Sequence, residues 1–280
     1  MELNAHAKLN LLLNVESKQF NGYHNLETIM IPLGLHDTII ANRVIGNSKI
    51  FISTNNSQLP TDERNVLYRC AELMKRKYSL TDGIEIYLDK KIPISSGLGG
   101  ESTDAAALIR FYNEEYNLNM SYSDVFYYGR LLGWDVPICY FNKCIYISDN
   151  KSINEFVNVK TEYYVLLVKP HYGILTKDAF VQIDKIENTS VAPDNLIDSL
   201  LTGANIGAHL HNCFIKTDNR LMLDYQTLQY FSKSIGFDGV SMSGTGSCFF
   251  LVTKDFNIAV NGYNELKSKY SYVNLTKTLK

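Results

Sequence analysis

The feature that most constrains the fold is a half-buried strand, a glycine-rich loop and a helix that follow one another directly. Residues 84–88 alternate apolar and polar side chains, as expected of a strand with one face in a core. A helix is predicted over 102–116, where apolar residues and small alanines recur without a glycine or proline. The loop consists of Pro93, Ile94, Ser95, Ser96, Gly97, Leu98, Gly99, Gly100, Glu101, Ser102 and Thr103.

The composition of this loop suits phosphate groups. Glycines let backbone N–H groups line a concave turn, and the helix that follows adds unpaired amides and the positive end of its dipole. No Gly-Lys-Ser/Thr follows the glycines, and Gly-x-Gly-x-x-Gly is not matched, so neither the P-loop nor the dinucleotide fingerprint is present. We expect the loop to hold the phosphates of ATP, with Ser102 and Thr103 donating hydroxyls or capping the helix. The alternative is a tight strand-to-helix turn.

Length and composition place the chain among ordinary globular proteins. With 280 residues, 45% hydrophobic and 20% charged, it can form one large domain or two lobes, and we favour two. A formal net charge of −2 lacks the basic excess of a nucleic-acid-binding protein. Lys8 and Asn10 interrupt any signal-peptide core, and no later apolar stretch approaches membrane-spanning length, so a cytoplasmic protein is expected.

The cysteines and histidines do not predict a metal site. The five cysteines form no Cys-x-x-Cys pair, are odd in number and lie in apolar surroundings, so we interpret them as core thiols. His209 and His211 could share one strand face, but no cysteine or carboxylate cluster accompanies them.

The order of predicted elements indicates an α+β protein. Strands are expected over 3–15, 26–33, 38–40, 50–52, 139–147, 163–168 and 248–252, with a hairpin turn at Asn21-Gly22. Helices are expected from Val66 to Tyr78, capped by Asn65, from Ser121 or Ser123 to Leu132, and over 194–201 and 225–235. The polar segment 148–152 is the predicted boundary, dividing the chain into lobes 1–152 and 153–280.

Four further segments accompany the loop in a recognisable order. They are Ala7-Lys8-Leu9-Asn10, Asn21-Gly22-Tyr23-His24, Leu132-Gly133-Trp134-Asp135-Val136-Pro137 and Ser243-Gly244-Thr245-Gly246-Ser247. Together with Gly97 to Ala106 they resemble the galactokinase, homoserine kinase, mevalonate kinase and phosphomevalonate kinase (GHMP) superfamily. Within it they are most similar to the 4-diphosphocytidyl-2-C-methyl-D-erythritol kinases of non-mevalonate isoprenoid synthesis. The resemblance extends from about Ala7 to Cys248.

This resemblance implies a fold and a reaction. The N-terminal lobe would be ribosomal-protein-S5-like, the C-terminal lobe ferredoxin-like, and the active site would lie between them. ATP would be the donor, with Mg²⁺ carried by the nucleotide, and the small-molecule acceptor would be the 2-hydroxyl of the cytidylyl-methylerythritol alcohol. Lys8 and Asp135 match the catalytic pair, with Asp135 as the base or orienter and Lys8 as its electrostatic partner. The alternative role of Lys8 is a structural surface salt bridge, and that of Asp135 is a helix-exit turn.

The resemblance also implies residues that bind the substrates. Tyr23 and His24 match the cytidine-binding dipeptide, Phe180 and Thr176 a second aromatic and a hydroxyl contact, and Asn10 and Lys90 further contacts to substrate or nucleotide. The alternative for Tyr23 and Phe180 is a structural role as core aromatics. The alternative for Lys90 is an ordinary solvated lysine. The Gly244–Gly246 turn would bring backbone close to the site, or form a hairpin turn.

Three departures from the family pattern bear on activity. Glu101 replaces a glycine in the phosphate loop, Gln19 and Asn21 occupy the usual arginine and aspartate places, and 148–152 replaces a small glycine-containing turn. A carboxylate at Glu101 would repel the triphosphate unless it points away or helps to hold the metal. A GHMP kinase for another small alcohol, or a nucleotide-binding homologue without catalysis, are therefore alternative functions.

Overall fold

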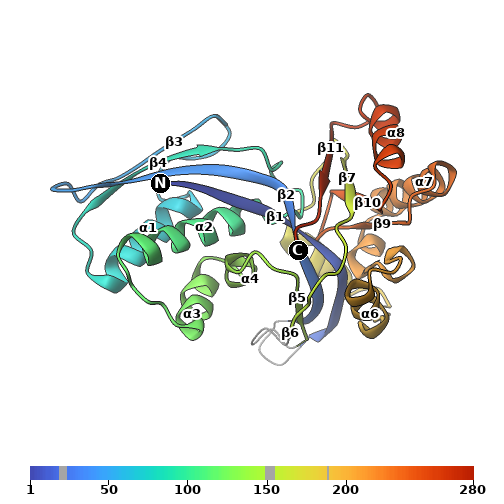
Figure 1. The fold of residues 1–280 in the computed structure, drawn as a ribbon, viewed down its shortest axis with the longest axis horizontal. Coiled ribbons are helices and arrows are strands. Elements are labelled where there is room, and N and C mark those ends of the chain that lie inside the picture. Colours follow the sequence, from blue (N-terminus) through green and yellow to red (C-terminus); the bar gives the residue numbers. More distant parts are fainter. Residues whose placement is uncertain (19–23, 149–154, 188) are drawn as a thin grey trace. The chain divides into compact units, whose positions relative to one another are not determined.

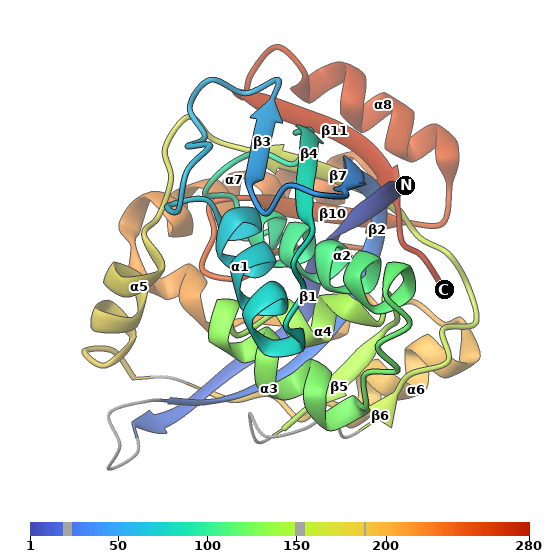
Figure 2. The ribbon, with the colours of Figure 1, turned by 90° about the vertical axis from the view of Figure 1, so that its left-hand side faces the viewer.

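The computed structural model describes residues 1–18, 24–148, 155–187 and 189–280 (Figures 1 and 2). Two compact units are present, and neither is continuous in sequence. The first comprises 1–7, 35–93 and 99–142, and the second 8–34, 94–98 and 143–280. Strands β1 (Glu2–Lys18) and β2 (His24–Val44) contribute to both units. The predicted boundary after residue 152 falls outside the described residues, and the two predicted lobe ranges stay a prediction.

The first unit has a sheet covered by helices. Strand β4 (Gly83–Asp89) pairs antiparallel with β2 and parallel with β3 (Ile50–Thr54), and β1 follows β2 in the sheet. Helices α1 (Val66–Tyr78) and α2 (Gly100–Glu115) lie on one face of these strands (Figure 1). The other helices of this unit are α3 (Tyr122–Leu132) and α4 (Val136–Tyr140). Their shared core buries the alanine-rich face of α2.

Local sequence accounts for the boundaries of these helices. The Asn65 side chain accepts a hydrogen bond from the Leu67 amide at 2.9 Å and so caps α1, as its sequence predicts. Ser121 and Asp124 form a reciprocal capping box at the start of α3. Helix α2 begins differently, because its N-cap is Gly99, with a φ of 75°.

The second unit contains a four-stranded antiparallel sheet in the order β11-β7-β10-β9. Its central strands, β7 (Tyr164–Lys169) and β10 (Phe249–Thr253), read as continuous apolar runs because both faces are covered. Helices α7 (Asn219–Ile235) and α8 (Phe256–Leu266) pack on this sheet (Figure 1). The remaining elements are β5 (Ile145–Ile147), β6 (Glu155–Phe156), α5 (Thr176–Ile183), α6 (Asp194–Thr202), η1 (Gly207–His209), β8 (His211–Asn212), η2 (Cys213–Thr217), β9 (Gly239–Met242) and β11 (Tyr272–Lys277).

Most of the predicted elements are confirmed, including the α+β class. One predicted strand is extended but not separate, and another is wrong over most of its length. The expected strand 38–40 is the continuation of β2, which runs without a break to Val44. The expected strand 139–147 begins as helix α4, since Pro137 in its first turn suits a helix start, and only Ile145–Ile147 is extended. All five cysteines are buried free thiols, as expected.

Helices α5 and α8 and strand β11 were not predicted. The predicted turn Asn21-Gly22 lies outside the described residues. Within the described part of the chain, no helix has the length and apolar character needed to cross a membrane.

Candidate active site

Three of the sequence motifs meet in the second unit. The Lys8 amide donates to the Leu98 carbonyl at 3.0 Å, which joins β1 to the glycine loop. The Ser243 hydroxyl donates to the Gly97 carbonyl at 2.9 Å, and the Cys248 amide donates to the Ser96 carbonyl at 3.1 Å. The start of the chain, the glycine loop and the turn after β9 therefore form one continuous piece of structure.

The backbone approach at this meeting point requires glycine. Gly97 has a φ of 77°, and a Cβ there would lie 2.0 Å from the Ser243 carbonyl oxygen. Gly244 has a φ of 56°, and its Cβ would lie 3.0 Å from the Gly97 carbonyl oxygen. The two turns interlock backbone to backbone, so the Gly244–Gly246 segment is more than a hairpin turn.

The side chain of Asn10 is the hub of this cluster. Its Oδ1 accepts from the Lys8 ammonium at 2.6 Å and from the Gly244 amide at 2.9 Å, while its Nδ2 donates to the Thr28 hydroxyl at 2.9 Å. Asn10 is 3% exposed and Lys8 6% exposed, so the surface salt bridge considered as the alternative for Lys8 is wrong. Asn10 orients the lysine, whereas its expected contact with a substrate stays a prediction.

Helix α2, in the first unit, begins without a side-chain cap. Its N-cap residue is Gly99, which has no side chain to occupy the first amides, and amides at such a helix start can bind an anion. Glu101 is exposed in the first turn, and Ser102 is partly exposed. The Thr103 hydroxyl donates to the His6 carbonyl at 2.6 Å and is fully buried, so the structure does not support its expected donation to phosphate or metal.

Lys90 does not have the exposed position expected of a ligand contact. Its ammonium lies 2.6 Å from both Asp37 and Asp104, and its side chain is 4% exposed. Burial opposes its charge, but Asp104 and Asp37 outweigh this effect and raise the pKa of Lys90. The alternative of a solvated lysine is therefore wrong, whereas the expected contact of Lys90 with substrate or nucleotide stays a prediction.

Asp135, also in the first unit, occupies the N-cap position of α4. Its carbonyl accepts from the Ile138 and Cys139 amides at 3.1 and 2.9 Å, whereas its carboxylate accepts no cap hydrogen bond from the described amides of α4. The side chain is half-buried. The helix turn thus places Asp135 without using its carboxylate as a cap.

Two of the residues expected to contact cytidine, His24 and Phe180, form a second cluster in the second unit. The His24 and Phe180 rings lie 5.4 Å apart, and His24 Nε2 is 2.6 Å from Asp184 Oδ1. The Thr176 hydroxyl is 3.3 Å from that of Thr245. Tyr23 lies outside the described residues.

Sequence reasoning missed Asp184 at this cluster. The available signal was its place four residues after Phe180, one turn further along the chain. The hydrogen bond from His24 holds the pKa of Asp184 below its usual value.

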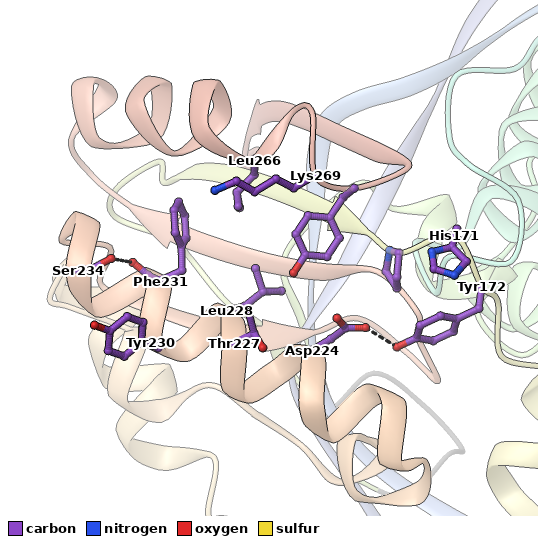
Figure 3. Close-up of a pocket in the computed structure, with 12 residues that line it drawn as sticks. His171, Tyr172, Asp224, Thr227, Leu228, Tyr230, Phe231, Ser234, Leu266 and Lys269 are labelled. Atoms are coloured by element: carbon purple, nitrogen blue, oxygen red, sulfur yellow. Dashed lines mark hydrogen bonds between the residues drawn. The ribbon is translucent and has the colours of Figure 1, made fainter.

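A separate cavity of about 470 Å³ lies between α7, α8 and the segment after β7 (Figure 3). It contains none of the predicted site residues. Its lining consists of Pro170, His171, Tyr172, Asp224, Thr227, Leu228, Tyr230, Phe231, Ser234, Leu266, Lys269 and Tyr270.

The side chains that could hold a metal ion bear on how Mg²⁺ would bind. Among the described residues, no group of three or more histidine, cysteine, aspartate or glutamate side chains could hold a metal ion. Mg²⁺ commonly uses one or two protein ligands together with nucleotide phosphates, and such a site needs no larger group.

Comparisons with known proteins agree with this chemistry. Residues 65–143 match the family described as GHMP kinases N terminal domain. The 4-diphosphocytidyl-2-C-methyl-D-erythritol kinase of Clostridium beijerinckii is 33% identical over 286 residues and covers 100% of both chains. The kinase of the same name from Clostridium tetani is 33% identical over 288 residues, with the same coverage.

Solved structures show the same fold. A crystal structure of 4-(cytidine 5'-diphospho)-2C-methyl-D-erythritol kinase has a TM-score of 0.84 at 23% identity and covers 100% of both chains. Homoserine kinase from Cytophaga hutchinsonii has a TM-score of 0.77 at 17% identity and covers 100% of this chain and 94% of its own. The predicted GHMP kinase fold is confirmed, whereas the S5-like and ferredoxin-like character of the two predicted lobes stays a prediction. With full-length identity of 33% to named relatives, the chain belongs to the 4-diphosphocytidyl-2-C-methyl-D-erythritol kinase family of the GHMP kinases.

Proposed function

We propose that this chain transfers the γ-phosphoryl group of ATP to the 2-hydroxyl of 4-diphosphocytidyl-2-C-methyl-D-erythritol. Like its relatives, the chain is a small-molecule kinase that uses ATP. The observation that carries the residue assignment is the buried Lys8–Asn10 contact of 2.6 Å, on a strand that is hydrogen-bonded to the glycine loop. A lysine held this firmly beside a phosphate loop can stabilise charge on a transferring phosphoryl group.

The glycine loop is proposed to bind the nucleotide. Backbone N–H groups of Gly97 to Gly100, the open start of α2 and the Ser102 hydroxyl would hold the phosphates, with Pro93 to Ser96 completing the loop. Mg²⁺, bound with the nucleotide, would neutralise phosphate charge, and Glu101 and Ser102 are the side chains at the helix start that could hold it.

The proposed chemical step uses Asp135 and Lys8. The Asp135 carboxylate takes the proton of the acceptor hydroxyl while that oxygen forms a bond to the γ-phosphorus and the bond to ADP breaks. The proton then passes to solvent. Lys8 offsets the charge of the phosphoryl oxygens and of Asp135.

Acceptor recognition is assigned to the His24 cluster. Tyr23 and Phe180 would stack on the cytosine, His24 would bond its polar edge, and Thr176 would contact the rest of the molecule. The protein is also proposed to act in the cytoplasm.

An acceptor-dependent ADP assay tests the function. We expect ADP with Mg-ATP only when the cytidylyl alcohol is added, and we expect Asp135→Asn to lower kcat by about 10²–10⁴-fold with KM for ATP nearly unchanged. Wild-type turnover in that variant would contradict the role of Asp135. Turnover with another alcohol alone would favour a different GHMP kinase. ATP binding without any turnover would favour a nucleotide-binding homologue without catalysis. The Glu101 carboxylate in the phosphate loop is the reason for considering this alternative.

A further inference from the structure

Two aspartates and a lysine form a buried cluster beneath the start of α2. Lys90 Nζ lies 2.6 Å from Asp37 Oδ2 and 2.6 Å from Asp104 Oδ2. The exposed fractions of the three side chains are 4%, 0% and 3% for Lys90, Asp37 and Asp104. Three ionisable groups this deeply buried require mutual compensation, because each alone would be strongly destabilising.

The cluster joins the two chain segments that flank the glycine loop. Asp37 Oδ1 accepts from the amides of Lys91 at 2.6 Å and Ile92 at 2.8 Å, just before the loop begins at Pro93. Asp104 belongs to the second turn of α2, just after the loop ends. A Cβ on Gly100 would lie 2.9 Å from Lys90 Nζ, so the ammonium lies directly against the first residue of the helix.

The hydrogen bonds of the two carboxyl groups differ. Asp37 accepts from three donors, whereas Asp104 Oδ1 has no hydrogen-bond partner among the described residues. Burial raises the pKa of Asp104 well above its usual value, Lys90 opposes this shift, and the neighbouring Asp37 carboxyl reinforces it. With Asp104 protonated, the cluster would be neutral overall and would present no net negative charge to an arriving triphosphate.

We propose that Asp37, Lys90 and Asp104 are positioning residues for the nucleotide, a clamp that holds both ends of the glycine loop in the geometry that binds the triphosphate. This inference rests on the proposed assignment of that loop to ATP. Lys90 and Asp37 act through the backbone, and Asp104 acts as a neutral hydrogen-bonding group.

Lys90→Met and its neighbour Lys91→Met form a matched pair for the test. Lys91 is half exposed, and its ammonium lies 3.3 Å from the Asp89 carboxylate. Because a loop displaced by about 1 Å loses about 100-fold in rate, we expect Lys90→Met to lower kcat/KM for ATP by about that factor. KM for the acceptor should change less than about twofold, since the acceptor is assigned to other elements, and Lys91→Met should match wild type. A general loss of folded protein would instead leave both KM values unchanged and lower the apparent kcat in proportion to the folded fraction.

Substitutions of the carboxyl groups test the assigned charges. Asp37→Asn would place an N–H₂ group against either the lysine or the two backbone amides, so it should resemble Lys90→Met. Asp104→Asn imitates the protonated acid and should rescue ATP affinity to within about threefold of wild type, whereas Asp104→Leu should lose it.

Binding of a non-hydrolysable ATP analogue, measured by isothermal titration, keeps this test separate from the proposed reaction. If no alcohol is phosphorylated, the proposed function fails, while weakened analogue binding in the clamp variants still supports the clamp. Wild-type affinity for the analogue in folded Lys90→Met or Asp37→Asn would overturn the clamp. Equal rises in KM for both substrates would also overturn it. So would a loss of analogue affinity in Asp104→Asn as large as that in Asp104→Leu. If Lys90→Met and Asp37→Asn do not fold, the two Asp104 variants decide: normal analogue binding by Asp104→Leu overturns the clamp, and weak binding supports it.

Discussion

A single methyl group at Gly97 is the sharpest test of the interlocked turns. In Gly97→Ala the new Cβ would lie 2.0 Å from the Ser243 carbonyl oxygen, 2.9 Å from the Ser243 carbonyl carbon and 3.2 Å from the Gly246 amide nitrogen. All three neighbours are backbone atoms, so no flexible side chain can move aside. Either the glycine loop or the Ser243–Gly246 turn must shift.

The magnitude follows from two contributions. A left-handed φ of 77° costs a non-glycine residue about 1–2 kcal/mol. Overpacking adds about 1–3 kcal/mol, so the expected loss in free energy of unfolding is about 2–5 kcal/mol in total. Relief of the overlap, from 2.0 Å to an ordinary contact of 3.4 Å, also moves one turn by more than 1 Å. A shift of this size in a phosphate-binding loop should lower kcat/KM for ATP by about 100-fold.

The assay combines urea unfolding with steady-state kinetics, and Gly236→Ala is the matched control. Gly236 belongs to the same unit and has a φ of 96°, but its Cβ would meet only the Ile258 Cδ1 atom at 3.4 Å. The control should therefore lose about 1–2 kcal/mol from backbone strain alone and keep wild-type kinetics. Equal losses of stability in the two variants, or wild-type kcat/KM in Gly97→Ala, would refute the reasoning.

Three further outcomes are expected. Asn10→Ala removes an acceptor that the Lys8 ammonium shares with the Gly244 amide, and the loss of this orientation should lower kcat about 10–100-fold with KM for the acceptor unchanged; wild-type kcat would show that Lys8 needs no orientation by Asn10. Asp184→Asn removes the carboxylate beside His24 and should raise KM for the acceptor about two- to fivefold with kcat unchanged, whereas an effect on ATP alone would contradict this placement. Burial raises the pKa of Cys144 and Cys248 to about 12, so these thiols stay protonated and unreactive at pH 8. A disulfide reagent should label all five buried cysteines only after unfolding in denaturant, and rapid labelling of the native protein would contradict their burial.

Much of the local structure followed from local chemistry. The alternation over 84–88, the Asn65 cap and the alanine-rich run after the glycine loop predicted β4, α1 and α2 because each depends only on neighbouring residues. The long strand β2 and the short helix α4 were harder, since one apolar run can be divided in several ways and short elements depend on their tertiary neighbours.

The sequence by itself also determined which residues are proposed to carry the chemistry, because Lys8, the glycine loop and Asp135 form short motifs with a recognisable order. Only the tertiary structure decided how they are held. The partners of Asn10 include Gly244, 234 residues away, and those of Lys90 include Asp37, 53 residues away. No periodicity or turn signal encodes such contacts, since they exist only after strands distant in sequence have paired. For the same reason Lys90 resembled a surface lysine in the sequence and is buried between two carboxyl groups in the fold.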